Sequence, residues 1–176
     1  GTIGQMSRVI NKVLTPVTHP LLQVKAAPGQ LSVKECNSLL AQLGGIYPRK
    51  YFVTGQPIGH SQSPNIHNSG YEALGLPHTY TKFETDNVDA VKREIKDLGN
   101  HFGGASVTIP LKESIISLCS ELSEDAQLIG AVNTLIPLDN GNIKGSNTDW
   151  NGIVNDFNKY GSVLNVENAL VIVAGV

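Results

Sequence analysis

Strands and short helices alternate along most of this chain, and this alternation constrains the fold more than any other feature. Between residues 51 and 160, apolar runs of strand length are separated by segments with helical periodicity. Glycine or proline stands at most of the boundaries. We therefore expect an α/β fold with a mostly parallel sheet flanked by helices.

The expected elements can be placed by residue range. We expect strands at residues 51–55, 78–84, 104–109, 131–137 and 169–176, and a hairpin turn at 140–145. We expect helices at residues 33–43, 64–74, 86–98, 111–119, 124–128 and 151–160. Ser32 and Glu35 form a capping box for the first helix. Glycines end three others, at Gly75, Gly99 and Gly161.

Composition and charge argue against several classes of partner. The 176-residue chain has a net charge of −2 and 16% charged residues, which predicts no broad basic face for nucleic acid or a membrane surface. No apolar run reaches the roughly 18 residues of a membrane span. Two distant cysteines and five scattered histidines give no pattern for a disulfide framework or a metal site, so we expect no metal and a cytoplasmic location.

Lys112 stands at an unusual position for a cation. Pro110 is expected to open a helix directly after a buried strand, so Lys112 falls in the first turn, where the macrodipole disfavours it by roughly 0.3–1 kcal/mol. Asp149 falls at another helix start, where capping alone is the simpler explanation. Both helices follow strands of the same sheet, so we expect the two side chains to meet at one edge. A lysine supported by a carboxylate suits general acid/base chemistry.

Two further motifs offer polar groups at element ends. Ser63 precedes Pro64 and is expected to cap a helix, but Ser61 adds a second hydroxyl beside the same free N–H groups. Such a pair suits an anion, for example a carboxylate. Asn133 lies in an apolar strand, where it either satisfies a neighbouring loop or contacts a polyhydroxylated ligand at the strand's carboxyl end.

Four motifs in order, "GQPIGHSQSPNIHN", "SVTIPLK", "GAVNT" and "GSNTDWNG", resemble the substrate-binding domain of shikimate dehydrogenase over about residues 51–176. The resemblance implies NADPH-dependent reduction of 3-dehydroshikimate to shikimate. It departs from many members of the family at Ser106, where they have asparagine before the VT pair. The implied site residues are the catalytic pair Lys112 and Asp149, the carboxylate ligands Ser61 and Ser63, and the substrate contacts Thr108 and Asn133.

Residues 1–48 resemble something else, the C-terminal end of a type I 3-dehydroquinate dehydratase barrel. The segments "GQMSR" and "AAPGQLS" carry this resemblance, which implies that Arg8 and Gln30 contact dehydroquinate. The family's serine before APGQ is replaced by Ala26 or Ala27, and its Schiff-base lysine and histidine lie upstream. The order of the two parts resembles that of the pentafunctional AROM polypeptides of fungi.

The last residues, "ALVIVAGV", are typical of the first strand of a dinucleotide-binding domain, although an ordinary buried strand explains them as well. On the first interpretation Gly175 contacts NADP. We then expect three parts: a barrel remnant at 1–48, the substrate-binding domain at 49–163 and the first Rossmann strand at 164–176.

The chain is expected to be a fragment of a larger multidomain polypeptide that binds a small-molecule substrate, and to be inactive in isolation. A homodimer is one assembly left open for the full-length enzyme. Two alternatives remain at this point. The first is a non-catalytic module that senses quinate or shikimate. The second is a lyase in which Lys112 forms a Schiff base with the substrate.

Overall fold

The computed structural model describes residues 2–11, 17–25, 27 and 29–164 of the chain. The chain divides into two compact units. Unit 1 comprises Gly1–Tyr51, Ser61–Thr81 and Leu98–Phe102, and unit 2 comprises Phe52–His60, Lys82–Asp97 and Gly103–Val176. The strand expected at residues 169–176, and with it Gly175, lies outside the described residues.

Unit 1 begins with two helices and a short parallel pair of strands. These elements are α1 (Thr2–Ile10), β1 (Val17–Thr18), β2 (Leu31–Ser32) and α2 (Val33–Gln42). The capping box predicted for α2 is confirmed. The Ser32 hydroxyl accepts a hydrogen bond from the Glu35 N–H, and the Glu35 carboxylate accepts one from the Ser32 N–H. The bonds that the Glu35 carboxylate accepts from the Ser32 N–H and from the Ser32 hydroxyl lower the pKa of this carboxyl.

Helix α1 contributes one side chain to a small hydrophobic core. The Val9 side chain is buried with Leu31 and Cys36 in a small core. Tertiary contacts of this kind stabilise helices that are too short to form alone. Other large apolar side chains of this region, such as Met6 and Leu21, are exposed. The core of this part of the chain is therefore small.

The rest of unit 1 includes a helix that side-chain contacts tie to the first residues of a strand, whose residues 82–84 belong to unit 2. These elements are α3 (Ser63–Leu74) and β4 (Thr79–Glu84). The side-chain amide of Asn68 donates to the Tyr80 carbonyl at 2.8 Å, and its oxygen accepts from the Tyr80 N–H at 2.8 Å. The His67 ring stacks on the Tyr80 ring, with 4.2 Å between their centroids. These contacts hold α3, and the serines at its start, against the backbone of β4.

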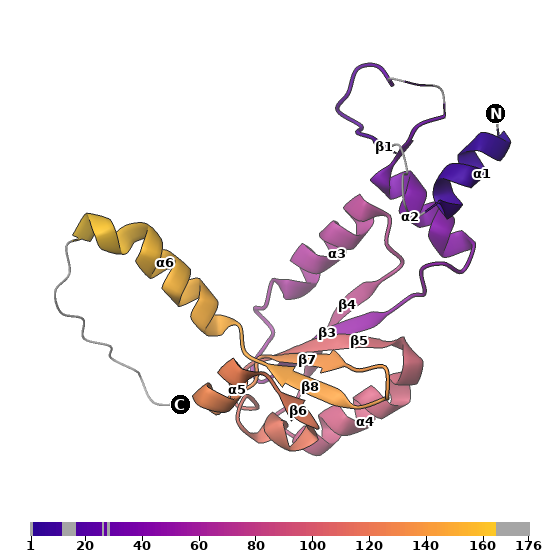
Figure 1. Cartoon of the computed structure of the whole chain (residues 1–176). Helices are drawn as coiled ribbons and strands as arrows, with labels where there is room; N and C mark the ends of the chain where they lie inside the picture. The colour runs from indigo at the N-terminus through magenta and orange to yellow at the C-terminus, as the bar shows by residue number, and fades with distance from the viewer. Residues whose placement is uncertain (1, 12–16, 26, 28, 165–176) are drawn as a thin grey trace. The chain divides into compact units, whose positions relative to one another are not determined.

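A six-stranded sheet has the strand order β4-β3-β5-β7-β8-β6 (Figure 1). Its other strands are β3 (Lys50–Gly55), β5 (Phe102–Val107), β6 (Glu121–Leu122), β7 (Thr134–Pro137) and β8 (Ile143–Ser146). The fold is therefore of the α/β class that the sequence predicted, with a mixed and mostly parallel sheet flanked by helices.

Strand β7 runs against both of its neighbours. It pairs antiparallel with β5, where Ser106 faces Thr134, and antiparallel with β8, where Thr134 faces Ser146. A hairpin turn joins β7 to β8 as predicted, and within it the Leu138 N–H donates to the Asn142 carbonyl at 2.9 Å. The turn lies earlier than the predicted residues 140–145, because residues 143–145 already belong to β8. Because β5 and β8 are both antiparallel to β7, their carboxyl ends lie at the same edge of the sheet as the amino end of β7.

The remaining helical elements are α4 (Val88–Leu98), η1 (Gly99–His101), η2 (Ser114–Leu118), α5 (Glu124–Ile129) and α6 (Asp149–Leu164). The prediction of a helix at residues 111–119 was wrong, because only the short 3₁₀ segment η2 forms there. In an α-helix the Lys112 carbonyl would accept from the Ile116 N–H. Instead it accepts from the Val132 N–H at 2.7 Å, and the Ile116 N–H bonds to the Glu113 carbonyl. Helix α6 continues past Gly161, where the sequence predicted its end.

The turn that carries Lys112 is anchored in the core of unit 2. Leu111 and Ile115, on either side of that turn, are 1% and 0% exposed. Burial of side chains of this size contributes roughly 1.5–3 kcal/mol each.

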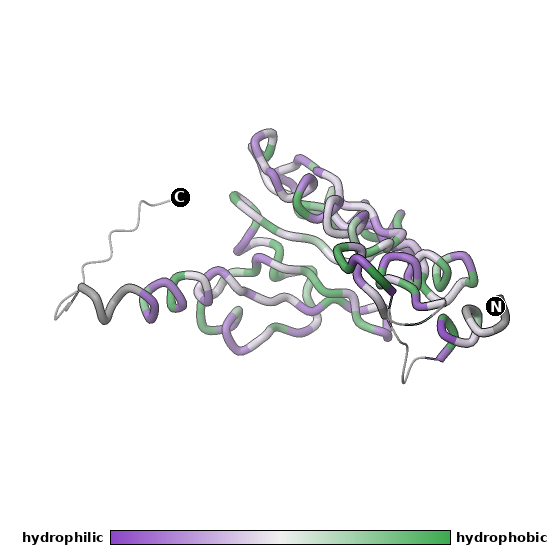
Figure 2. Tube along the Cα trace, turned by 90° about the horizontal axis from the view of Figure 1, so that it is seen from above, coloured by the Kyte–Doolittle hydropathy of each residue, from purple (hydrophilic) through white to green (hydrophobic). Residues whose placement is uncertain are grey.

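Hydrophobic and hydrophilic residues alternate over short distances along the trace (Figure 2). Within the described part of the chain, no helix is long and apolar enough to cross a membrane.

Candidate active site

Lys112 and Asp149 form an ion pair at the edge where β5 and β8 end. Lys112 lies in the turn after β5, and Asp149 is the first residue of α6, which follows β8. The Lys112 Nζ donates to the Asp149 Oδ2 at 2.7 Å, and the two side chains are 33% and 51% exposed. The structure therefore brings the predicted pair together. It does so without the helix start that the sequence predicted at Lys112, so the macrodipole argument for this lysine does not apply.

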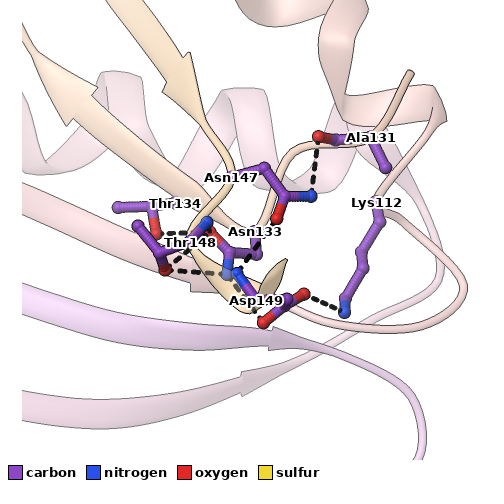
Figure 3. A network of polar contacts seen from close by, with 7 residues as sticks. All are labelled: Lys112, Ala131, Asn133, Thr134, Asn147, Thr148 and Asp149. Carbon is purple, nitrogen blue, oxygen red and sulfur yellow. Dashed lines mark hydrogen bonds and ion pairs between the residues drawn. The ribbon is translucent and has the colours of Figure 1, made fainter. Parts of the chain in front are cut away.

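Asn133, which directly precedes β7, bonds to this pair at the same edge of the sheet (Figure 3). Its Nδ2 donates to the Asp149 Oδ1 at 2.8 Å and to the Thr148 Oγ1 at 3.0 Å, and its Oδ1 accepts from the Thr134 hydroxyl at 2.7 Å. The sequence predicted Asn133 inside or at the carboxyl end of a strand, and this was wrong. Asn133 directly precedes β7, and the antiparallel direction of β7 brings it to the site.

The environment of Asp149 favours its charged form. Burial raises the pKa of this carboxyl, but hydrogen bonds from Lys112 and Asn133, together with the positive charge of Lys112, outweigh burial and lower it below its ordinary value. At neutral pH the carboxylate is thus a fixed acceptor that holds the lysine ammonium in one place.

Asn147 is a site residue that the sequence analysis missed. Its side chain is 3% exposed, its Oδ1 accepts from the Asp149 N–H at 3.0 Å, and its Nδ2 donates to the Ala131 carbonyl at 3.0 Å (Figure 3). An asparagine two residues before a helix's first residue is a signal for such a turn. The bond to Ala131 is tertiary and has no local signal.

Thr108 follows β5 and packs closely against the end of β3. Its N–H donates to the Thr54 carbonyl at 2.9 Å, and its own carbonyl accepts from the Leu111 N–H at 3.0 Å. A Cβ on Gly55, which has φ +143°, would lie 2.5 Å from the Thr108 Cγ2 and 2.5 Å from the Ile109 carbonyl oxygen. Only glycine allows this approach, so Gly55 contributes to the position of Thr108.

Ser61 and Ser63 lie together in unit 1, at the start of α3. The Ser61 hydroxyl donates to the Ser63 Oγ at 3.2 Å and accepts from the Ser63 N–H at 3.3 Å. The prediction that Ser63 caps the helix was wrong. Ser63 is already the first helical residue, and Gln62 precedes it without a side-chain cap. Capping therefore does not explain the serine at position 63.

The residues predicted to contact dehydroquinate lie in the first part of unit 1. Arg8 is in the last turn of α1, and Gln30 directly precedes β2. The Gln30 side-chain oxygen accepts from the Ala27 N–H at 3.4 Å, and its carbonyl accepts from the Lys25 Nζ at 3.0 Å. Within the described ranges, no group of three or more His, Cys, Asp and Glu side chains is placed to hold a metal ion.

Comparison with protein families gives a match in each part of the chain. Residues 53–135 match the shikimate dehydrogenase substrate binding domain, and residues 1–47 match type I 3-dehydroquinase. Both resemblances expected from the sequence are confirmed.

Curated relatives contain the two parts in one polypeptide. The chain is 56% identical over 152 residues to the pentafunctional AROM polypeptide of Saccharomyces cerevisiae strain YJM789, a match that covers 86% of this chain and 10% of the relative. It is 52% identical over 180 residues to that of Schizosaccharomyces pombe, covering 99% of this chain and 11% of the relative. The chain thus spans about a tenth of the length of the curated relatives it matches.

Solved structures agree with this assignment. The dehydroquinate dehydratase and shikimate dehydrogenase from S. pombe AroM matches with a TM-score of 0.74 and 52% identity, over 88% of this chain and 29% of that chain. Shikimate 5-dehydrogenase from Thermus thermophilus in complex with shikimate matches with a TM-score of 0.56 and 34% identity, over 64% of this chain and 43% of that chain.

Proposed function

We propose that the chain supplies the substrate-binding part of a shikimate dehydrogenase, which reduces 3-dehydroshikimate to shikimate with NADPH. The observation that carries this proposal is the Lys112–Asp149 ion pair at 2.7 Å, held by Asn133 within a sequence that matches this family. A paired ammonium at the edge of a sheet suits a reaction in which a carbonyl oxygen gains a proton.

In the proposed reaction the ring carbonyl carbon gains a hydride and its oxygen gains a proton. NADPH, when bound, supplies the hydride. Lys112 stabilises the developing alkoxide through its ammonium group and donates the proton from Nζ, and the reverse reaction returns the proton to the same atom. Asp149 holds one N–H of this ammonium, which leaves the others for the substrate oxygen.

The remaining contacts are assigned to the substrate's other polar groups. Ser61 and Ser63 are proposed to bind the carboxylate, because two hydroxyls lie 3.2 Å apart at the start of the 12-residue helix α3. Thr108 and Asn133 are proposed to bind ring hydroxyls. In the part that matches 3-dehydroquinase, Arg8 and Gln30 are proposed to contact dehydroquinate.

The nucleotide is assigned to residues outside the described part of the chain. Gly175 remains the proposed contact, as part of the expected glycine-rich turn of an NADP-binding domain. The described residues therefore contribute the substrate and proton-transfer half of the site. We also propose that the chain works within a multidomain polypeptide, because the curated relatives it matches are pentafunctional polypeptides. The proposed cytoplasmic location rests on the cysteine content of the sequence.

Substrate binding tests this proposal directly. Trp150, the only tryptophan, follows Asp149, so its fluorescence is expected to report shikimate binding to the 176-residue chain. Ser61→Ala or Ser63→Ala should weaken binding about tenfold or more, because a hydrogen bond to a charged group contributes roughly 1.5–3 kcal/mol. The exposed Ser69→Ala in the same helix is the matched control.

The methyl ester of shikimate makes this test specific for the carboxylate. The ester should bind the wild-type chain more weakly than shikimate does, and the difference should shrink in the serine variants. Equal binding of acid and ester by the wild-type chain would contradict the proposed role of the serines. Borohydride trapping of a Schiff base on Lys112 would instead indicate a lyase. Binding without turnover in a polypeptide that includes the NADP-binding domain would indicate a sensing module.

A further inference from the structure

Asn147 connects the main chains of two segments of the candidate site. It lies between β8 and α6 and is 3% exposed. Its oxygen accepts from the Asp149 N–H, and its amide donates to the Ala131 carbonyl, each at 3.0 Å (Figure 3). Because both partners are main-chain atoms, these bonds constrain the path of the chain. Because Asn147 is buried, the loss of either bond would leave a partly buried main-chain group without a partner.

The segment that Asn147 reaches also holds the backbone of Lys112. Val132, the residue after Ala131, is fully buried, and its N–H donates to the Lys112 carbonyl at 2.7 Å. The next residue, Asn133, donates from its N–H to the Ser146 carbonyl at 3.0 Å. Residues 131–133 are thus bonded to the turn of Lys112 on one side and to the end of β8 on the other.

We propose that Asn147 is a positioning residue that fixes the Asp149 backbone relative to the Lys112 backbone through Ala131 and Val132. The proposal rests on the proposed function, in which this pair transfers a proton. The exposed side chains of the pair cannot set their own geometry, because a long lysine side chain in water loses rotamer entropy when it is held. Their 2.7 Å separation therefore depends on where the two main chains are held.

Two substitutions separate the two bonds of Asn147. Asn147→Ala removes both bonds. Asn147→Ser keeps an acceptor for the Asp149 N–H, as serine does in turns of this type, but is too short to reach Ala131. Asn142→Ala removes an exposed amide from the β7–β8 turn and is the matched control.

The first measurement is an NMR titration of the Asp149 carboxyl in the 176-residue chain. Burial raises its pKa, while bonds from Lys112 and Asn133 lower it to a net value below the ordinary one. If Asn147 positions the pair, its substitution weakens the hydrogen bonds from Lys112 and Asn133 that lower the Asp149 pKa. This pKa should therefore rise in Asn147→Ser and rise further in Asn147→Ala. It should stay unchanged in Asn142→Ala. A role limited to stabilising the hairpin would lower the melting temperature and leave this pKa in place.

The second measurement is turnover in a chimera in which this chain replaces the matching segment of the S. pombe polypeptide, 52% identical to it. Asn147→Ala should lower kcat for shikimate oxidation on the order of tenfold, less than the roughly 100-fold loss that a 1 Å misplacement can cause, with a smaller change in KM.

The Asp149 titration and the turnover of the chimera test the positioning role and the proposed function separately. An unchanged Asp149 pKa together with an unchanged kcat in folded Asn147→Ser would overturn the positioning role, and this variant decides the matter if Asn147→Ala does not fold. A wild-type chimera that does not oxidise shikimate would overturn the proposed function, whereas the titration would still decide whether Asn147 positions the pair.

Discussion

Replacing Lys112 by alanine separates a catalytic role of the Lys112–Asp149 pair from a structural one. The pair is close, at 2.7 Å, but its side chains are 33% and 51% exposed. Pairs this exposed contribute about 0.2–1 kcal/mol to stability, because solvent and salt screen them. We therefore expect Lys112→Ala to lower the free energy of unfolding by less than about 1 kcal/mol, which is a fall of about 2–4 °C or less in melting temperature.

The pH dependence of this small contribution has a definite sign. Burial raises the Asp149 pKa and the bonds from Lys112 and Asn133 lower it, with a net lowering in the folded chain. A carboxyl with a lowered folded pKa adds stability above its unfolded pKa, near about 3.9, and that stability is lost as the pH falls through the folded value. The stability difference between wild type and Lys112→Ala should thus be constant above about pH 5 and shrink below it.

Catalysis should respond far more strongly than stability. Loss of a general acid typically costs about 10²–10⁴ in rate, so kcat of the Lys112→Ala chimera should fall by that order. Guanidinium unfolding of the 176-residue chain gives the stability, and steady-state NADP reduction by the chimera gives kcat. Lys92→Ala, at an exposed lysine of α4, is the control. A kcat within twofold of wild type, combined with a stability loss above about 2 kcal/mol, would show that the pair is structural.

Two other predictions concern the supports of the site. Gly55→Ala should destabilise the chain by more than about 1 kcal/mol and weaken shikimate binding, because its Cβ would lie 2.5 Å from both Thr108 and Ile109; Gly59→Ala, with nothing within 4 Å, should be close to neutral in urea unfolding. Asn68→Ala should cost about 1–3 kcal/mol in the same measurement, because it leaves two backbone groups of β4 without their 2.8 Å partners. Unchanged unfolding midpoints would refute either argument.

Features that depend on neighbours in the sequence were predicted correctly. The capping box of Ser32 and Glu35, the end of α3 at Gly75 and the hairpin turn before Asn142 each involve groups a few residues apart. The order of the four motifs was enough to predict the family that residues 53–135 match. The sequence also placed Lys112 and Asp149 together, because both follow strands whose carboxyl ends share an edge.

Features that depend on competition between distant groups were not predictable in this way. The residues after Pro110 have a helical pattern. However, the Lys112 carbonyl, which would accept a bond within an α-helix, accepts one from the Val132 N–H instead. Asn133 reaches the site from the amino end of β7, because β7 runs antiparallel to its neighbours. Val9 stabilises α1 because it is buried with Leu31 and Cys36, which come much later in the sequence.

The sequence by itself therefore determined the class of fold, the local caps and turns, and which residue types are available for proton transfer. It did so because periodicity, capping and turn chemistry act within a few residues. The tertiary structure alone decided that Asn147 ties Asp149 to Ala131 and that Val132 bonds to the Lys112 carbonyl. Those outcomes depend on backbone groups brought together from segments far apart in the chain, and no local pattern records which of them will bond.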